Sequence, residues 1–186
     1  MQIYTDYLMT ISLPYSIVKE VNRYKRSSVN AIGHFEGMYK TPNIMISHQT
    51  HCKHFLTDTA IEKMKDRLAL MPPIELQIIG FDFFKETPFC YTIYAVIEKN
   101  IETENWFNQL ITEMEFKVQH FVPMILIAKK LEADQFKTLW PLFAVQEFEG
   151  SFTVNSLTIL QKETFTENSH WRVYRELFFG TRQLAF

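Results

Sequence analysis

The spacing of apolar residues in the first half of the chain predicts alternating strands and helices. The first β-rich run ends at a proline, after which Ile17, Val18 and Val21 share one helical face. The first half is expected to contain these elements in order: strand 7–14, helix 15–27, a glycine-containing loop 27–40, strand 41–47, helix 57–71 and strand 72–84. The second helix is expected to be capped by Thr57 or Asp58.

The same order of elements begins again in the second half of the chain. Trp106, Leu110, Ile111 and Met114 lie at helical spacing, with a β-rich run before them and an apolar run after them. The elements expected here are strand 89–100, helix 103–116, strand 120–131, helix 132–143, strand 150–163 and a last strand at 170–179. The last of these has no counterpart in the first half.

The central strands of the two halves align with each other. Residues 41–47 match residues 122–128, with a proline, two isoleucines and a small residue in common. We expect one bilobal domain over residues 1–186, in which repeats at about 1–86 and 87–163 form two lobes and 170–179 adds a final strand. An approximate two-fold axis would bring the equivalent strands to a shared cleft, where ligand sites prefer to form.

Each central strand is expected to turn one face to the cleft and the other to a core, because side chains alternate along a strand. The residues expected on the cleft faces are Asn43, Met45 and Ser47, and Met124, Leu126 and Ala128. The residues expected in the cores are Ile44, Ile46, Ile125 and Ile127. Asn43 is a polar residue that a short apolar strand does not need.

The amino-acid composition limits the classes of protein to which this chain can belong. The 186 residues are 47% hydrophobic, enough for a sizeable core, and the net charge of −2 argues against strong nucleic-acid binding through a basic surface. Two cysteines, Cys52 and Cys90, are too few for a disulfide framework and fit a reducing compartment. The N-terminus lacks a signal-peptide pattern and no apolar run is long enough to span a membrane. We expect a cytoplasmic protein with no membrane contact and no cofactor, and its oligomeric state stays open.

The sequence resembles the two-histidine (2H) phosphoesterase family, which includes the bacterial 2'-5' RNA ligase-like proteins and cyclic phosphodiesterases. The resemblance runs through nearly the whole chain. It is carried by "LP" before the first helix, the two proline-led central strands, "LQIIGFDFF" between them, and "FTVNSLTILQKE" followed by "WRVYRELFF". It implies a bilobal α+β fold, with two antiparallel-type sheets related by a pseudo-two-fold around a central cleft and helices on the outside.

The family places a His-x-Thr or His-x-Ser motif on each central strand, facing the cleft. By this resemblance the first motif has become Asn43 and Met45, and the second Met124 and Leu126. Hydrolysis of a cyclic phosphodiester needs a proton acceptor and a proton donor, and histidine suits both because its pKa lies near neutrality. An asparagine amide and a methionine thioether do not transfer protons in this range. Both motifs are therefore degenerate.

Other residues could in principle restore catalysis or binding. His48 and Thr50 form a literal His-x-Thr displaced by five positions, but regular alternation points His48 away from the face of Asn43 unless a bulge intervenes. His34 and His120 are further catalytic candidates. The residues considered for ligand binding are Ser47, His34, Tyr39 and Lys130. The basic residues of the first helix are expected on its solvated face: Lys19, Arg23, Lys25 and Arg26.

The segment 48–54 also suggests a metal site. His48, His51, Cys52 and His54 have the side chains that zinc prefers, although their spacing does not make them converge on one point. An exposed polar loop explains the segment equally, and we expect no metal.

Two hypotheses of function follow. The leading one is a catalytically degenerate 2H phosphoesterase-like protein that keeps its cleft to bind a nucleotide, another small molecule or a partner. The alternative is an active cyclic phosphodiesterase or 2'-5' RNA ligase-like enzyme that acts on nucleotide 2',3'-cyclic phosphates or RNA ends through His48, His34 or His120.

Overall fold

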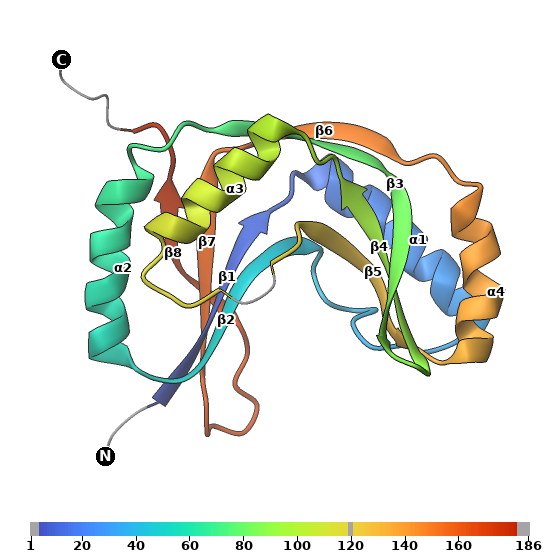
Figure 1. Ribbon diagram of the computed structural model, residues 1–186. Helices are drawn as coiled ribbons and strands as arrows, with labels where there is room; N and C mark the ends of the chain where they lie inside the picture. The colour runs from blue at the N-terminus through green and yellow to red at the C-terminus, as the bar shows by residue number, and fades with distance from the viewer. Residues whose placement is uncertain (1–3, 119–120, 182–186) are drawn as a thin grey trace.

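The computed structural model describes residues 4–118 and 121–181, which form two antiparallel four-stranded sheets with helices on their outer sides (Figure 1). The first sheet has the strand order β2-β1-β7-β8. Its strands are β1 (Tyr4–Ser12), β2 (Asn43–Lys53), β7 (Ser156–Glu163) and β8 (Arg172–Phe178). The second sheet has the order β5-β4-β3-β6. Its strands are β3 (Ile74–Thr87), β4 (Cys90–Ile97), β5 (Met124–Leu131) and β6 (Glu149–Val154). The expected α+β architecture is confirmed.

Four helices flank the sheets in the described part of the chain. They are α1 (Tyr15–Ile32), α2 (His54–Leu68), α3 (Ile101–Glu113) and α4 (Ala133–Ala144). Helices α1 and α4 pack against the second sheet, while α2 packs against the first sheet with α3 beside it (Figure 1). Helix α1 therefore follows β1 of the first sheet in the sequence but packs against the second sheet.

The two sheets do not follow the two halves of the sequence. Strand β3 lies in the first half but pairs with β4, and β7 lies in the second half but pairs with β1. The expected single strand 150–163 is in fact two strands, because the chain leaves the second sheet after Val154 and enters the first at Ser156. The two strand orders nevertheless correspond position by position, with β2 and β5 at equivalent edges.

Helix α1 is longer than the sequence pattern predicts. It begins after Pro14 and continues to Ile32, so the loop expected from residue 27 is wrong over its first residues. Gly33 ends the helix with φ 76°, a conformation that glycine adopts without strain, and its N–H donates to Val29 O at 2.8 Å. Ser27 and Asn30 are exposed in the last turns of the helix, whereas Ser28 is buried and donates to Tyr24 O at 3.0 Å. This mixture of polar residues gives no clean apolar period, so the pattern misplaced the end of the helix.

Strand β2 is also longer than expected, and α2 begins earlier. Residues 48–53 pair with β1 as part of β2, so this polar segment is a strand and not a loop. Helix α2 then starts at His54, which makes the predicted cap at Thr57 or Asp58 wrong. Thr57 Oγ1 instead donates to Lys53 O at 3.3 Å, within the first turn.

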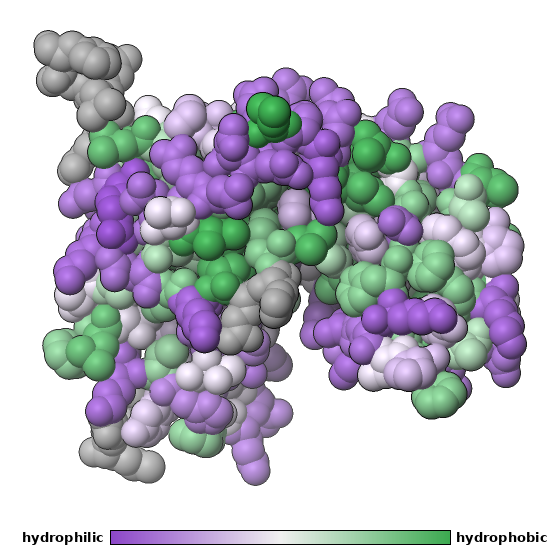
Figure 2. Space-filling view, in the orientation of Figure 1, coloured by the Kyte–Doolittle hydropathy of each residue, from purple (hydrophilic) through white to green (hydrophobic). Residues whose placement is uncertain are grey.

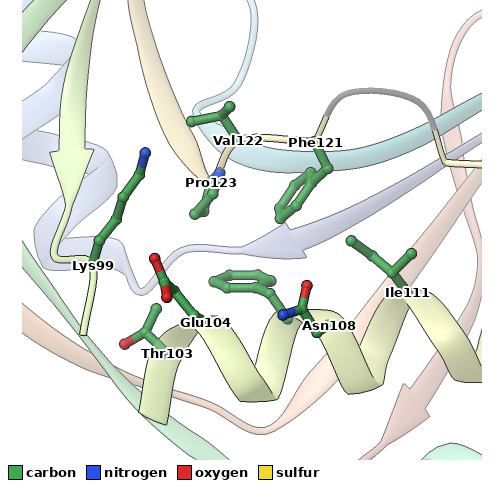
Figure 3. Close-up of a pocket in the computed structure, with 9 residues that line it drawn as sticks. Lys99, Thr103, Glu104, Asn108, Ile111, Phe121, Val122 and Pro123 are labelled. Atoms are coloured by element: carbon green, nitrogen blue, oxygen red, sulfur yellow. The ribbon is translucent and has the colours of Figure 1, made fainter. Parts of the chain in front are cut away.

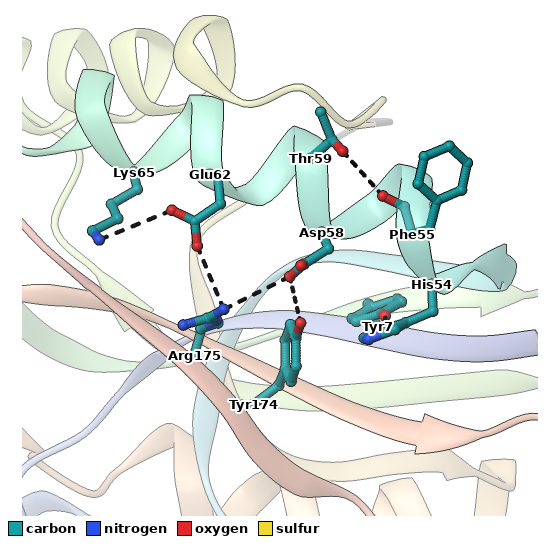
Figure 4. A network of polar contacts seen from close by, with 9 residues as sticks. All are labelled: Tyr7, His54, Phe55, Asp58, Thr59, Glu62, Lys65, Tyr174 and Arg175. Atoms are coloured by element: carbon teal, nitrogen blue, oxygen red, sulfur yellow. Dashed lines mark hydrogen bonds and ion pairs between the residues drawn. The ribbon is translucent and has the colours of Figure 1, made fainter.

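A polar network fixes the start of α2 to the first sheet (Figure 4). Tyr7 Oη lies 2.5 Å from His54 Nδ1, Tyr174 donates to Asp58, and Arg175 lies 3.4 Å from Glu62. Burial raises the pKa of Tyr7 to about 12, which keeps this hydroxyl neutral and able to donate. The network occupies the helix side of the sheet.

The cores lie between each sheet and its helices. The predicted stripe Ile61, Met64 and Leu68 is fully buried beneath α2, and Ile17 and Val21 are buried beneath α1. Ile44 and Ile125 on the central strands are buried as expected, and Ile46 and Ile127 are buried too, although both also border the space between the two sheets. Within the described ranges no helix is long and apolar enough to cross a membrane.

Candidate functional site

A cavity of about 500 Å³ lies between the two sheets, where the edge strands β2 and β5 approach each other. The space-filling view is notched at this place (Figure 2). The four positions to which the resemblance assigns the two motifs all line the cavity: Asn43, Met45, Met124 and Leu126. Asn43 Nδ2 donates to Thr41 O at 3.2 Å, so the amide caps the start of its own strand at the edge of the cavity.

Both central strands carry a β-bulge at the same position. In the first sheet Met45 lies opposite Thr10 and Ser47 opposite Met9, which leaves Ile46 as an extra residue. In the second sheet Leu126 lies opposite Tyr94 and Ala128 opposite Ile93, which leaves Ile127 as the extra residue. If Asn43 is aligned with Met124, the two extra residues coincide.

The bulges reverse the predicted faces of the residues that follow them. His48 lines the cavity, contrary to regular alternation, and Lys129 at the matching position of β5 lines it too. Ser47 was expected on the cleft face, but it is 6% exposed and lies opposite the core residue Met9. Ala128 was likewise expected there and is 1% exposed. One extra residue shifts the two-residue period by one, so every later side chain changes face.

Other predicted candidates lie elsewhere. His34 and Tyr39 pack edge to face against each other, 6.5 Å between ring centroids, and neither lines the cavity. Thr50 is exposed and does not line the cavity either. Lys130 points to Glu36, with 2.7 Å between the charged atoms, and this hydrogen bond is the main cause of the lowered pKa of Glu36. His120 lies outside the described residues.

Lys25 and Trp171 are among the cavity residues that the sequence pattern missed. Lys25 was expected on the solvated face of α1, yet it is 4% exposed and lines the cavity. Its Nζ donates to Gly37 O at 3.0 Å and Lys40 O at 2.8 Å. Burial, followed by the charge of Lys40, lowers the pKa of Lys25 to about 8. Trp171, just before β8, also lines the cavity and packs against His48 with 5.6 Å between ring centroids.

The proposed metal ligands do not come together. His48 faces the cavity, His54 contacts Tyr7 on the helix side of the sheet, and His51 packs against Phe165. In residues 4–118 and 121–181 no group of three or more His, Cys, Asp or Glu side chains could hold a metal ion.

Asp6 holds the distal part of β2 in place. His51 has φ 56°, and its backbone N–H donates to Asp6 Oδ1 at 3.0 Å. Thr164 Oγ1 donates to the same oxygen at 2.7 Å, and Lys162 Nζ lies 3.6 Å from Oδ2. Burial alone raises the pKa of Asp6, but these partners together outweigh it and leave the pKa below its usual value.

We expect Asp6→Asn to lower the free energy of unfolding at pH 7 by about 1–3 kcal/mol, because hydrogen bonds to a charged group are lost. A carboxyl with a depressed folded pKa stabilises the fold above its ordinary pKa of about 4 and loses that contribution as the pH falls through the folded value. The difference between wild type and variant, measured by urea unfolding, should therefore shrink below about pH 4. A difference independent of pH would contradict this role.

A smaller cavity of about 270 Å³ lies between α3 and the segment before β5 (Figure 3). It is lined by the apolar side chains of Phe107 and Ile111 and by the polar side chains of Lys99, Glu104 and Asn108. Phe121 and Val122 line both cavities. The described residues that line this cavity include no histidine.

The two four-stranded sheets, with β2 and β5 facing a shared cavity, give this chain the fold of the 2H phosphoesterases. TT0787 of Thermus thermophilus matches it with a TM-score of 0.65 at 10% identity, over 96% of this chain and 100% of that one. E. coli LigT complexed with 3'-AMP matches with a TM-score of 0.65 at 11% identity, over 94% and 98% of the two chains. A crystal structure of a phosphoesterase matches with a TM-score of 0.62 at 11% identity, over the same shares.

Further matching structures of E. coli LigT are complexes with phosphate, NADP+ or ATP. No family model and no curated protein matches the sequence. The relationship is therefore one of fold, and it confirms the resemblance at that level.

Proposed function

We propose that this protein is a catalytically degenerate 2H phosphoesterase-like protein that keeps its cleft to bind a small ligand. The observation that carries the proposal is the lining of the central cavity: the motif positions Asn43, Met45, Met124 and Leu126 face it and none of them can transfer a proton. A volume of about 500 Å³ is within the range of small-molecule sites. The free, half-buried thiols of Cys52 and Cys90 fit a cytoplasmic setting.

The matching LigT structures support a small molecule as the occupant. LigT is complexed with 3'-AMP in one of them and with phosphate in another. In this chain a phosphate placed between Met124 and Leu126 would face apolar atoms, and burying charge without partners is costly. The nature of the ligand is therefore expected to differ from that of LigT.

One observation favours the alternative of an active enzyme. The bulge at Ile46 brings His48 onto the cavity, and the equivalent bulge brings Lys129 onto its other side. A histidine and a lysine could act as base and acid in the hydrolysis of a cyclic phosphate. The hydroxyl groups that the family uses to hold the phosphate would still be missing, because Thr50 does not line the cavity.

Turnover of 2',3'-cyclic nucleotides separates the two functions. We expect purified wild-type protein to show no hydrolysis of the four 2',3'-cyclic nucleotides above the level of its His48→Ala variant, because loss of a positioned acid or base costs about 10² to 10⁴ in rate. The assay is separation of the monophosphate products by chromatography. Hydrolysis by the wild type that disappears in His48→Ala would overturn the degenerate-site proposal and establish an enzyme with a relocated histidine.

A further inference from the structure

We propose that the cavity binds an organic monoanion, with an apolar or aromatic body and one carboxylate, whose charged group is held by the ammonium of Lys25. This inference rests on the proposed function and specifies the ligand class of the same site. Its starting point is that Lys25 is 4% exposed and lines the cavity, a burial that lysines almost never show without a charged partner.

The hydrogen bonds of Lys25 leave it incompletely satisfied. Its two acceptors are the backbone carbonyls of Gly37 and Lys40, and no carboxylate pairs with it in the described part of the chain. A lysine ammonium has three N–H donors, so one remains beyond these two bonds. A pKa lowered to about 8 still leaves the side chain charged at pH 7. A buried cation with a spare donor on a ligand-sized cavity is suited to an anion.

The other charges of the cavity limit the ligand to a single negative charge. Lys40 and Lys129 line the cavity, but so do the carboxylates Glu36 and Glu86. Glu36 precedes Gly37, which accepts a hydrogen bond from Lys25, and Glu36 also forms a β-bridge with Lys129 near the end of β5. These charged residues therefore lie at the same end of the cavity as Lys25. Glu86 accepts a hydrogen bond from Thr92 at 2.6 Å and Glu36 is paired with Lys130, so both carboxylates have polar partners in place. A second negative charge on the ligand would meet them at short range.

The rest of the wall is suited to an apolar body. Its large side chains are Met45, Phe84, Phe121, Met124, Leu126 and Trp171. The ring of Trp171 is held between His48, 5.6 Å away, and the ammonium of Lys162, 5.1 Å from its centroid. Trp171 packs against His48 within β2, while Lys25 bonds to Lys40 before that strand begins, so the indole stands away from Lys25 and offers a stacking face for a flat ring. The cavity thus has one charged end and one aromatic end.

The proposal is tested with a matched pair of probes, 2-naphthoate and neutral 2-naphthamide, by isothermal titration calorimetry at pH 7. We expect wild-type protein to bind the carboxylate about 10- to 100-fold more tightly than the amide, the range given by a hydrogen bond to a charged group. Lys25→Met should abolish this preference while keeping amide binding, and Lys19→Met, on the exposed side of the same helix, should leave it unchanged.

A pH titration of the wild type tests the same point without a mutation that could loosen the segment around Gly37. Above about pH 8 the affinity for 2-naphthoate should fall about tenfold per pH unit, because binding then requires protonation of Lys25. The other charged groups facing this site are Glu36, Lys40, Glu86 and Lys129, with His48 at the far end. Lys25→Met keeps all of them, so the pH dependence should be absent in that variant.

The outcomes separate this inference from the proposed function. Equal affinities for acid and amide, both weakened by the cavity-filling change Met124→Trp, would leave the binding function standing and refute the anion site. A preference for the acid that survives Lys25→Met would also refute it, because another cation would then be the anchor. No binding of either probe at millimolar concentration would count against both.

Discussion

Placing a His-x-Thr motif on each central strand is expected to give this protein measurable hydrolysis of 2',3'-cyclic nucleotides. The changes are Asn43→His and Met45→Thr on β2 and Met124→His and Leu126→Thr on β5. All four side chains already line the cavity, so the new groups would face one another across it. One imidazole could then accept a proton from water while the other donates to the leaving oxygen, and each such group typically contributes about 10² to 10⁴ in rate.

Half-restored variants provide the matched controls. With histidine and threonine on only one strand, the reaction lacks either its acid or its base, so turnover should fall at least about 10²-fold below the fully restored variant. Circular dichroism and urea unfolding check that each variant is folded. A folded variant with both motifs that is no faster than wild type would show that the two motifs are not sufficient for catalysis in this cleft.

The sequence correctly predicted which side of a helix or strand is buried wherever the spacing of apolar residues was regular. Ile61, Met64 and Leu68 beneath α2, and Ile44 and Ile125 on the central strands, are buried because a regular period fixes the side that a residue takes. Past the bulges the prediction of faces failed, since a bulge inserts one residue without leaving a signal in the apolar pattern. Ser47, expected in the cleft, is therefore buried, while His48 lines the cavity. For the same reason Lys130 was predicted as a binding residue, whereas Lys129 is the one that lines the cavity.

Long-range packing explains the other differences. Lys25 looks like a surface residue because its neighbours in the helix are charged, but the segment carrying Gly37 and Lys40 folds over it and buries it. The split of the expected strand 150–163 likewise depends on two sheets that the local sequence does not reveal. Asn43, Met45, Met124 and Leu126 line the cavity as the alternation predicts, because they lie before the bulges.

The packing of α1 on the second sheet yields the second large expected effect, a loss of stability in Tyr24→Ala. Tyr24 is 3% exposed, and its ring lies 4.8 Å from Phe81, 5.3 Å from Phe148 and 6.0 Å from Phe143, measured between centroids. Removing a buried ring of this size typically costs about 3–5 kcal/mol, through lost burial and the cavity left behind. We expect the free energy of unfolding in urea to fall by about that amount.

Tyr15→Ala on the same helix is the matched control. Tyr15 is 81% exposed, so the same chemical change should alter stability by no more than about 0.5 kcal/mol. Because α1 follows a strand of the first sheet and packs against the second, the difference between the two variants measures how strongly this helix ties the sheets on either side of the cavity together. Equal losses in both would show that the aromatic cluster around Tyr24 does not hold the helix in place.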